Sequence, residues 1–140
     1  MITQEQLDAH AAWMRCEPGG IRLDLSDANL IRADLTGVVL TRAALRGSDL
    51  TRANLSGAVL TRANLRGSDL TGADLTDAVL TGADLTDAVL TGADLTGAVL
   101  TRAALRGSDL TGADLTRAVL TDADLFGAGQ VGAAQVGAAQ

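Results

Sequence analysis

The amino-acid sequence predicts an all-β fold in which the chain winds as a four-sided parallel β-helix, with a capping α-helix at its N-terminus. Three observations predict it. From Leu25 to Leu125 every fifth residue is Leu, and the residue two positions before each Leu is almost always small. A Val directly precedes the Leu at every twentieth position, from Val39 to Val119. Repetition at a fixed period indicates a solenoid, and twenty residues divided by five give each coil four sides.

Neither an α-helix nor a continuous strand accommodates a period of five residues. At about 100° per residue, Leu residues five apart would scatter around a helix instead of forming an apolar stripe. In a strand, where side chains alternate with a period of two, they would point to opposite faces in turn. We therefore expect each five-residue unit to be a short extended segment followed by a corner, with 21 units between Leu23 and Gly127.

Within a unit, the small residue and the Leu are expected to point inward, and the residue between them outward. Stacked at about 4.8 Å, the coils would form a rod roughly 25 Å long. The last residue of the unit is Gly in 11 units, Arg in six and Asp in four. Because Arg42, Arg62 and Asp77 occupy this position, we expect that the corner does not require a positive φ in every unit. The Leu centres expected in the core include Leu35, Leu55, Leu75, Leu95 and Leu115.

Residues 1–22 are expected to form an N-terminal helical cap and linker. Thr3 and Gln6 have the spacing of a capping box. They predict a helix over residues 4–16, ended by the Pro18-Gly19-Gly20 segment. Its apolar face is expected to cover the open end of the first coil, because a solenoid leaves its core exposed at both ends.

Residues 128–140 continue the five-residue phase, but Gln replaces Leu at its centre. Gln130, Gln135 and Gln140 would then point inward. The segment is either a degenerate cap, whose amides satisfy one another, or a flexible low-complexity tail. Between this segment and the helical cap, residues 23–127 are expected to form the β-helix.

The composition excludes several classes of function. The 17 acidic and 11 basic residues give a net charge of −6, which argues against nucleic acid and anionic membrane as partners. No apolar run approaches the 18 or so residues of a membrane span, and the N-terminus lacks the basic and apolar regions of a secretory signal. With Cys16 as the only cysteine, no internal disulfide can form. We expect a cytoplasmic protein.

No arrangement of residues indicates catalysis, a cofactor or a metal. Residues 127–132 match the spacing GxGxxG, but no βαβ unit surrounds them. The chain has no Lys, which excludes the Walker A phosphate loop. His10 and Cys16 are the only His and Cys, and they fall short of a structural zinc site. We expect an end-capping or exposed His, an inert Cys and no enzyme activity.

Units such as Ala73-Asp74-Leu75-Thr76-Asp77 and Ala53-Asn54-Leu55-Ser56-Gly57 resemble the pentapeptide-repeat family, whose pattern is A(D/N)LXX. The resemblance covers residues 23–127. It implies a right-handed quadrilateral β-helix, which agrees with the four sides inferred above and adds the handedness. The chain departs from the family in its regularity, because natural members often place Phe at the centre of a unit and here every centre is Leu.

One outward column is apolar, and we call it the valine row. It predicts a contact surface, because apolar stripes often mark interfaces. The partner would be a second copy of the chain, giving a lateral homodimer, or a different protein. Alternatively, Val occurs there only because it is favoured in strands, and the side chains stay partly exposed to solvent. The valine row consists of Val39, Val59, Val79, Val99 and Val119.

Carboxylates form periodic outward columns, which are either a solvated surface or an imitation of a phosphate backbone. Within the repeats, 14 Asp accompany nine Arg, and Arg46, Arg66 and Arg106 form a basic column. One stretch without Arg, the acidic belt, consists of Asp74, Asp77, Asp84, Asp87 and Asp94. The family resemblance implies an alternative function for it, DNA mimicry and binding to DNA gyrase, as in quinolone-resistance members. The first interpretation is a non-enzymatic structural or protein-interaction solenoid.

Overall fold

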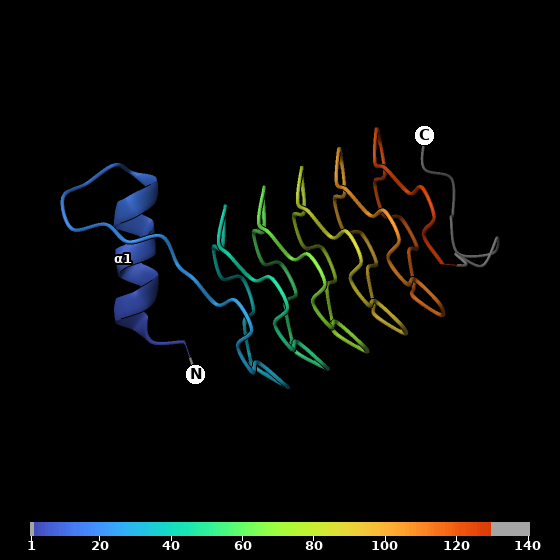
Figure 1. Ribbon diagram of the computed structural model, residues 1–140, viewed down its shortest axis with the longest axis horizontal. Helices are drawn as coiled ribbons and strands as arrows, with labels where there is room; N and C mark the ends of the chain where they lie inside the picture. The colour runs from blue at the N-terminus through green and yellow to red at the C-terminus, as the bar shows by residue number, and fades with distance from the viewer. Residues whose placement is uncertain (1, 130–140) are drawn as a thin grey trace.

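A computed structural model describes residues 2–129 and confirms the four-sided parallel β-helix. Figure 1 shows helix α1, Gln4–Met14, followed by coils of similar outline stacked along one axis. Residues twenty apart pair as isolated parallel bridges, as between Val59 and Val79. The Leu60 N–H donates to the Val79 carbonyl at 2.7 Å, and the Val79 N–H donates to the Ala58 carbonyl at 2.9 Å. Each coil is therefore hydrogen-bonded to the coils before and after it.

The interior contains the Leu centres and the small residues two positions before them, except near the ends of the rod, where Ala33 is only partly buried and Leu125 is 36% exposed. All five centres named above are buried, and Leu55 and Leu75 have no exposed surface. Three small inward residues are serines, and all three are buried. Their hydroxyls donate to the carbonyl of the preceding Leu, as Ser68 does to Leu65 at 2.6 Å. A polar group is tolerated inside because its hydrogen bond is satisfied locally.

The expectation about the corners is wrong, because all 21 corner residues have positive φ, between 55° and 71°. The corner is a tight turn in which the next small residue donates to the preceding Leu carbonyl, as Ala78 does to Leu75 at 3.0 Å. A turn of this kind with positive φ at its third residue is type II. Closure of the square coil thus requires the left-handed conformation even at Arg42 and Asp77, where φ is 60° and 55°.

Helix α1 begins where the capping box predicts. The Gln6 N–H donates to Thr3 Oγ1 at 3.2 Å, and the Thr3 N–H donates to Gln6 Oε1 at 2.9 Å. Two of the N–H groups that lack partners at a helix start are thereby satisfied.

The helix ends two residues earlier than predicted. Cys16 has a φ of 58°, and its N–H donates to the Trp13 carbonyl at 3.0 Å. The Glu17 N–H donates to the Ala12 carbonyl at 2.9 Å. This pair of bonds is a Schellman motif, which satisfies the last carbonyls and turns the chain away before Pro18 is reached.

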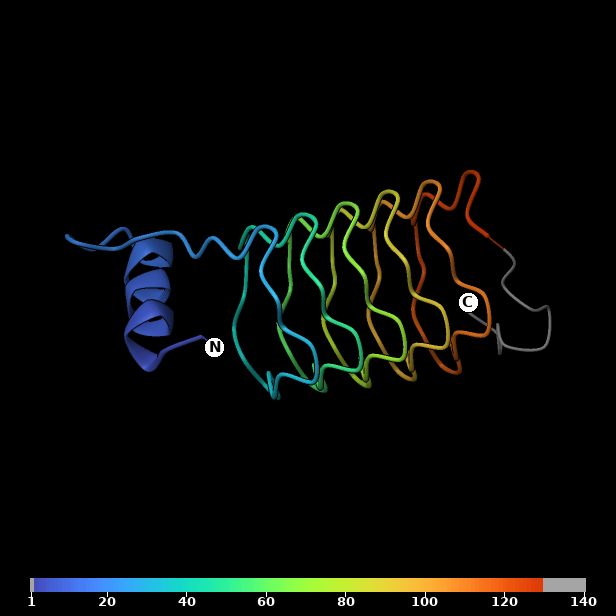
Figure 2. The ribbon, with the colours of Figure 1, turned by 60° about the horizontal axis from the view of Figure 1, so that its bottom comes forward.

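Helix α1 lies across the N-terminal end of the rod (Figures 1 and 2). His10 is fully buried there, and its Nδ1 accepts the Leu23 N–H at 3.0 Å. Ile2 and Leu7 are partly buried against the core. The helix is too short to span a membrane, and the described residues include no helix long and apolar enough to do so.

At the other end, the coil continues through residue 129. The Ala128 N–H donates to the Leu125 carbonyl at 3.0 Å, and the Gly129 N–H donates to the Ser108 carbonyl at 2.7 Å. The predictions for Gln130, Gln135 and Gln140 lie outside the described residues.

Candidate interaction surfaces

The valine row lies on one side of the rod, as its period predicts. Each valine forms a parallel bridge with the next, so the five side chains make a continuous column. Val39 and Val119 at the ends are 46% and 38% exposed, and the three between them are half-buried by their neighbours. The outward bridge positions of this side bear no charge.

Charges flank the valine row at the corners on both edges. The edge that follows the valines carries Arg42, Arg62, Gly82, Arg102 and Asp122. The edge that precedes them carries Gly37, Gly57, Asp77, Gly97 and Arg117. The side is therefore an apolar ribbon with a charged rim, the general layout of a protein interface.

The carboxylates concentrate on two adjacent sides. Bridges connect Asp49 to Asp69 on one side, and Asp74 to Asp94 on the next. Together the two sides carry seven carboxylates at outward positions: Asp34, Asp49, Asp69, Asp74, Asp94, Asp109 and Asp114.

Each of these carboxylates is tied to its own backbone. Oδ1 of Asp74 accepts the Thr76 N–H at 2.9 Å, and Asp94 makes the same bond with Thr96. At Asp34, hydrogen bonds from the Thr36 hydroxyl and then from the Thr36 N–H lower the pKa of the carboxyl. Our sequence interpretation missed this role. The signal is the recurring Asp-Leu-Thr triplet, since Asp commonly bonds the backbone two residues on.

The acidic belt is not one patch. Asp74 and Asp94 stack on one side, whereas Asp84 bridges Asn64 on the opposite side. Nor is the belt free of Arg, because Arg66 Nη2 lies 3.2 Å from Asp87 Oδ2. That part of the prediction is wrong, because residues twenty apart are spatial neighbours and Arg66 reaches its partner from the preceding coil.

The basic column is partly neutralised in the same way. Arg106 lies 3.8 Å from Asp124 and also packs over the Phe126 ring, 5.2 Å from its centroid. On the neighbouring corner, Arg102 lies 3.8 Å from Asp122.

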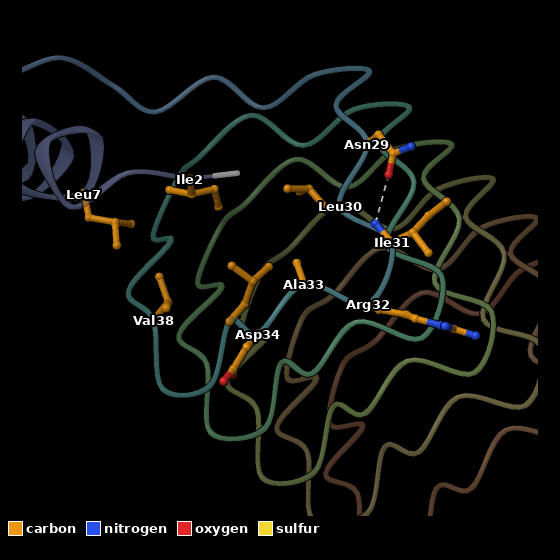
Figure 3. A pocket seen from close by; sticks show the side chains of 10 residues that line it. Ile2, Leu7, Asn29, Leu30, Ile31, Arg32, Ala33, Asp34 and Val38 are labelled. Carbon is orange, nitrogen blue, oxygen red and sulfur yellow. Dashed lines mark hydrogen bonds between the residues drawn. The ribbon is translucent and has the colours of Figure 1, made fainter.

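An opening of about 450 Å³ separates α1 from the first coil. In Figure 3, Ile2 and Leu7 line it from the helix end of the chain, with Leu30 to their right and Val38 below them. The helix therefore covers the end of the core only in part, through Ile2, Leu7 and the buried His10.

Neither His10 nor Cys16 lies in a metal or catalytic cluster. His10 caps the first coil; burial, with a smaller effect of the Arg22 charge, lowers its pKa, against an opposing effect of the Thr41 backbone. Cys16 is exposed at the helix end. Over residues 2–129, no three His, Cys, Asp or Glu side chains gather to hold a metal ion.

Comparisons with known proteins agree on one family. The family model for pentapeptide repeats matches eight copies, over residues 24–62, 58–97 and 98–128. The chain is similar to HetL from the cyanobacterium Nostoc, described as involved in heterocyst differentiation regulation, with 40% identity and a TM-score of 0.55. That match covers 77% of this chain but only 57% of HetL.

A second similar structure is a pentapeptide repeat protein from the Arabidopsis thaliana thylakoid lumen. It is 33% identical with a TM-score of 0.59, over 73% of this chain and 70% of that protein. No curated protein matches the sequence.

Proposed function

Because the chain belongs to the pentapeptide repeat family, we propose that it is a non-enzymatic protein-interaction solenoid that self-associates laterally through the valine row. One observation carries the proposal: an apolar column continuous over five coils, on a side whose outward bridge positions are all Val. Two such ribbons have the same coil spacing, so each valine of one copy would meet a valine of the other.

The charged rim favours a parallel pair of rods. In a parallel pair related by a two-fold axis, the edge that precedes the valines in one copy faces the edge that follows them in the other. Arg117 of each copy then meets Asp122 of the other, and no like charges meet. In an antiparallel pair centred on Val79, Asp77 would meet its own copy and Arg62 would meet Arg102. Like charges that meet across an interface are unfavourable, whereas complementary ones set register and orientation.

The size of one side argues for a weak, reversible dimer. Five coils at about 4.8 Å give a ribbon roughly 24 Å long and one side wide, which falls at the low end of specific interface areas. We therefore expect association at tens to hundreds of micromolar rather than a permanent dimer. The cytoplasm, expected from the sequence, is the proposed compartment.

The experiment is a solution mass measurement by sedimentation equilibrium between about 10 and 500 µM. The parent chain should dimerise with concentration, and the variant with Val79→Asp and Val99→Asp should stay monomeric. Val89→Asp is the matched control, because Val89 occupies the same position of a unit on another side, between Asp69 and Asp109. A parent chain that remains monomeric, or a double variant with the parent's association, would refute self-association through this side.

A second candidate, a DNA-mimicking protein that binds DNA gyrase, is favoured by the seven carboxylates on two adjacent sides. It predicts that the chain inhibits supercoiling by gyrase. It also predicts that Asp74→Asn with Asp94→Asn weakens the inhibition, while Asp84→Asn, on the opposite side, does not. Supercoiling that is unaffected by excess chain would reject this candidate.

A further inference from the structure

A second opening, of about 480 Å³, lies beside the last residues of α1. Trp13 and Met14 form its apolar wall at the helix end, and Arg42 and Arg62, together with three threonines, line it from the coils. Openings that bind small molecules have volumes of about 300–1,000 Å³ and combine apolar walls with a few converging polar groups.

Arg42 and Arg62 occupy the same corner on consecutive coils, and the Arg42 N–H donates to the Thr61 carbonyl at 2.9 Å. Their corner positions are therefore separated by the coil spacing of about 4.8 Å. Within residues 2–129, neither guanidinium forms an ion pair with a carboxylate. Arg102, on the same corner further along, does reach a carboxylate, that of Asp122. Two arginines without an ion pair in residues 2–129 thus lie at neighbouring corners beside the opening.

The outward bridge residues beside the two arginines are uncharged on both adjoining sides: Val39, Val59, Ala44 and Asn64. The nearest negative charges on the adjoining sides belong to Asp24 and Asp84, each one coil away from the pair of bridge residues beside the arginines. A third guanidinium, that of Arg22, adds to the positive charge, because its Nε–H donates to the Arg42 carbonyl at 2.7 Å.

The apolar wall is held in place by packing. The Trp13 ring stacks on the buried His10 ring, with centroids 5.6 Å apart and planes inclined by 12°. Trp13 itself is only partly buried. The indole is thus held by its stacking on His10, and Trp13 also lines the opening.

We propose that this opening binds a small phosphate monoester with an apolar or aromatic body. A monoester carries a charge of about −1.5 to −2 at pH 7, which matches the two guanidiniums. The guanidinium fork binds phosphate oxygens through paired hydrogen bonds. The indole and the Met14 thioether would contact the body of the ligand. Arg42 and Arg62 also belong to the charged rim beside the valine row, but no valine of the row lines the opening, and binding there does not require self-association.

Phenyl phosphate is the probe, and Trp13 reports its binding, because the chain has one Trp and no Tyr. Titration of the full chain should give a saturable change in tryptophan emission. The variant with Arg42→Gly and Arg62→Gly should bind at least about tenfold more weakly. Glycine suits these corners, since Gly82 already occupies the next position of the column with a φ of 65°. Arg102→Gly is the matched control and should bind as the parent does.

Calorimetry on the same samples measures affinity independently of the fluorophore, and circular dichroism verifies that each variant is folded. Phenol, which lacks the phosphate, should bind far more weakly than phenyl phosphate. Three results would each overturn the proposal: no saturable binding of phenyl phosphate up to about 10 mM, equal binding of phenol, or a folded double variant that retains the parent's affinity.

Discussion

At the scale of the residue, the corners of consecutive coils constrain one another. Asp27, Asp77 and Asp87 are each followed one coil later by Gly, at 47, 97 and 107. In each case an Asp oxygen occupies the space that a Cβ on the following coil would need; at Gly107 the separation would be 2.8 Å. A corner Arg does not restrict the corner of the next coil in this way, because Arg62 lies one coil after Arg42. A corner Asp therefore favours Gly above it, because a Cβ there would displace the carboxylate. This corner rule is visible only once the coils are stacked.

The division between inside and outside predicts very different costs for adjacent positions. Leu75→Ala should lower the free energy of unfolding by about 2–5 kcal/mol, because it removes a fully buried side chain and leaves a cavity. Thr76→Ala, at a half-exposed corner position, should cost less than about 1 kcal/mol. Urea denaturation of both variants measures the difference. Equal losses at the two positions would contradict the assignment of Leu75 to the core.

The inward and outward positions could be predicted from the sequence, whereas the conformation of the corner could not. The burial of Leu75 follows from a period that no helix or strand accommodates. The positive φ at Arg42 follows from the type II turn that ends every side of the coil. The Arg and Asp residues found at this position of the unit had argued against a positive φ, because that conformation favours Gly. For non-glycine residues this conformation costs about 1–2 kcal/mol. Closure of the coil and its hydrogen-bonded ladder outweighs that cost.

At the scale of the element, the start of α1 was predictable and its end and contacts were not. The side chains of Thr3 and Gln6 each accept a hydrogen bond from the other residue's N–H, within four residues of sequence, so the capping box is visible in the sequence. The end depends on Cys16 adopting a conformation usually taken by Gly. The role of His10 depends on the Leu23 N–H, which lies thirteen residues away on the first coil.

The His10 contact predicts that stability falls in mild acid. Burial lowers the pKa of His10 below its usual 6.5, so below about pH 6.5 the unfolded chain binds a proton that the folded chain resists. The full contribution is present above about pH 6.5 and declines as the pH falls toward the folded pKa. Thermal melts between about pH 7.5 and pH 5 should show a falling midpoint.

His10→Gln is the matched control, because an amide oxygen can accept the Leu23 N–H without titrating. Its melting temperature should change little over the same range, since the chain has no second His. A parent chain whose midpoint is constant across this range, or a variant that keeps the parent's slope, would exclude His10 as the source.

At the scale of the whole molecule, a surface is defined by residues twenty apart and not by neighbours in the sequence. The valine row could be predicted because its period equals one coil. The acidic belt could not be assembled by the same means, because a run of twenty residues passes around all four sides. The charge of Asp87 is met by Arg66 from the preceding coil, a contact that a linear stretch without Arg conceals.

The same geometry predicts that one added unit destroys the proposed interface without removing a valine. A copy of residues 53–57 inserted after Gly82 adds one whole five-residue unit. Every unit then keeps its inward, outward and corner positions, so the coil should still close. It moves Val99 and Val119 to the next side and places Asp94 above Val79. The insertion also respects the corner rule, because Asp77 then lies below Gly92. Circular dichroism should show the parent's fold, and sedimentation equilibrium should show a monomer.

Duplication of residues 43–62 is the matched control, because a complete coil of twenty residues lengthens the valine row by one member and keeps it on one side. That variant should associate at least as tightly as the parent, since each added apolar contact increases the buried area. If the five-residue insertion folds and still dimerises like the parent, the interface does not depend on valines aligned along one side. If the duplication abolishes association, the register of the rim charges, and not the row itself, determines pairing.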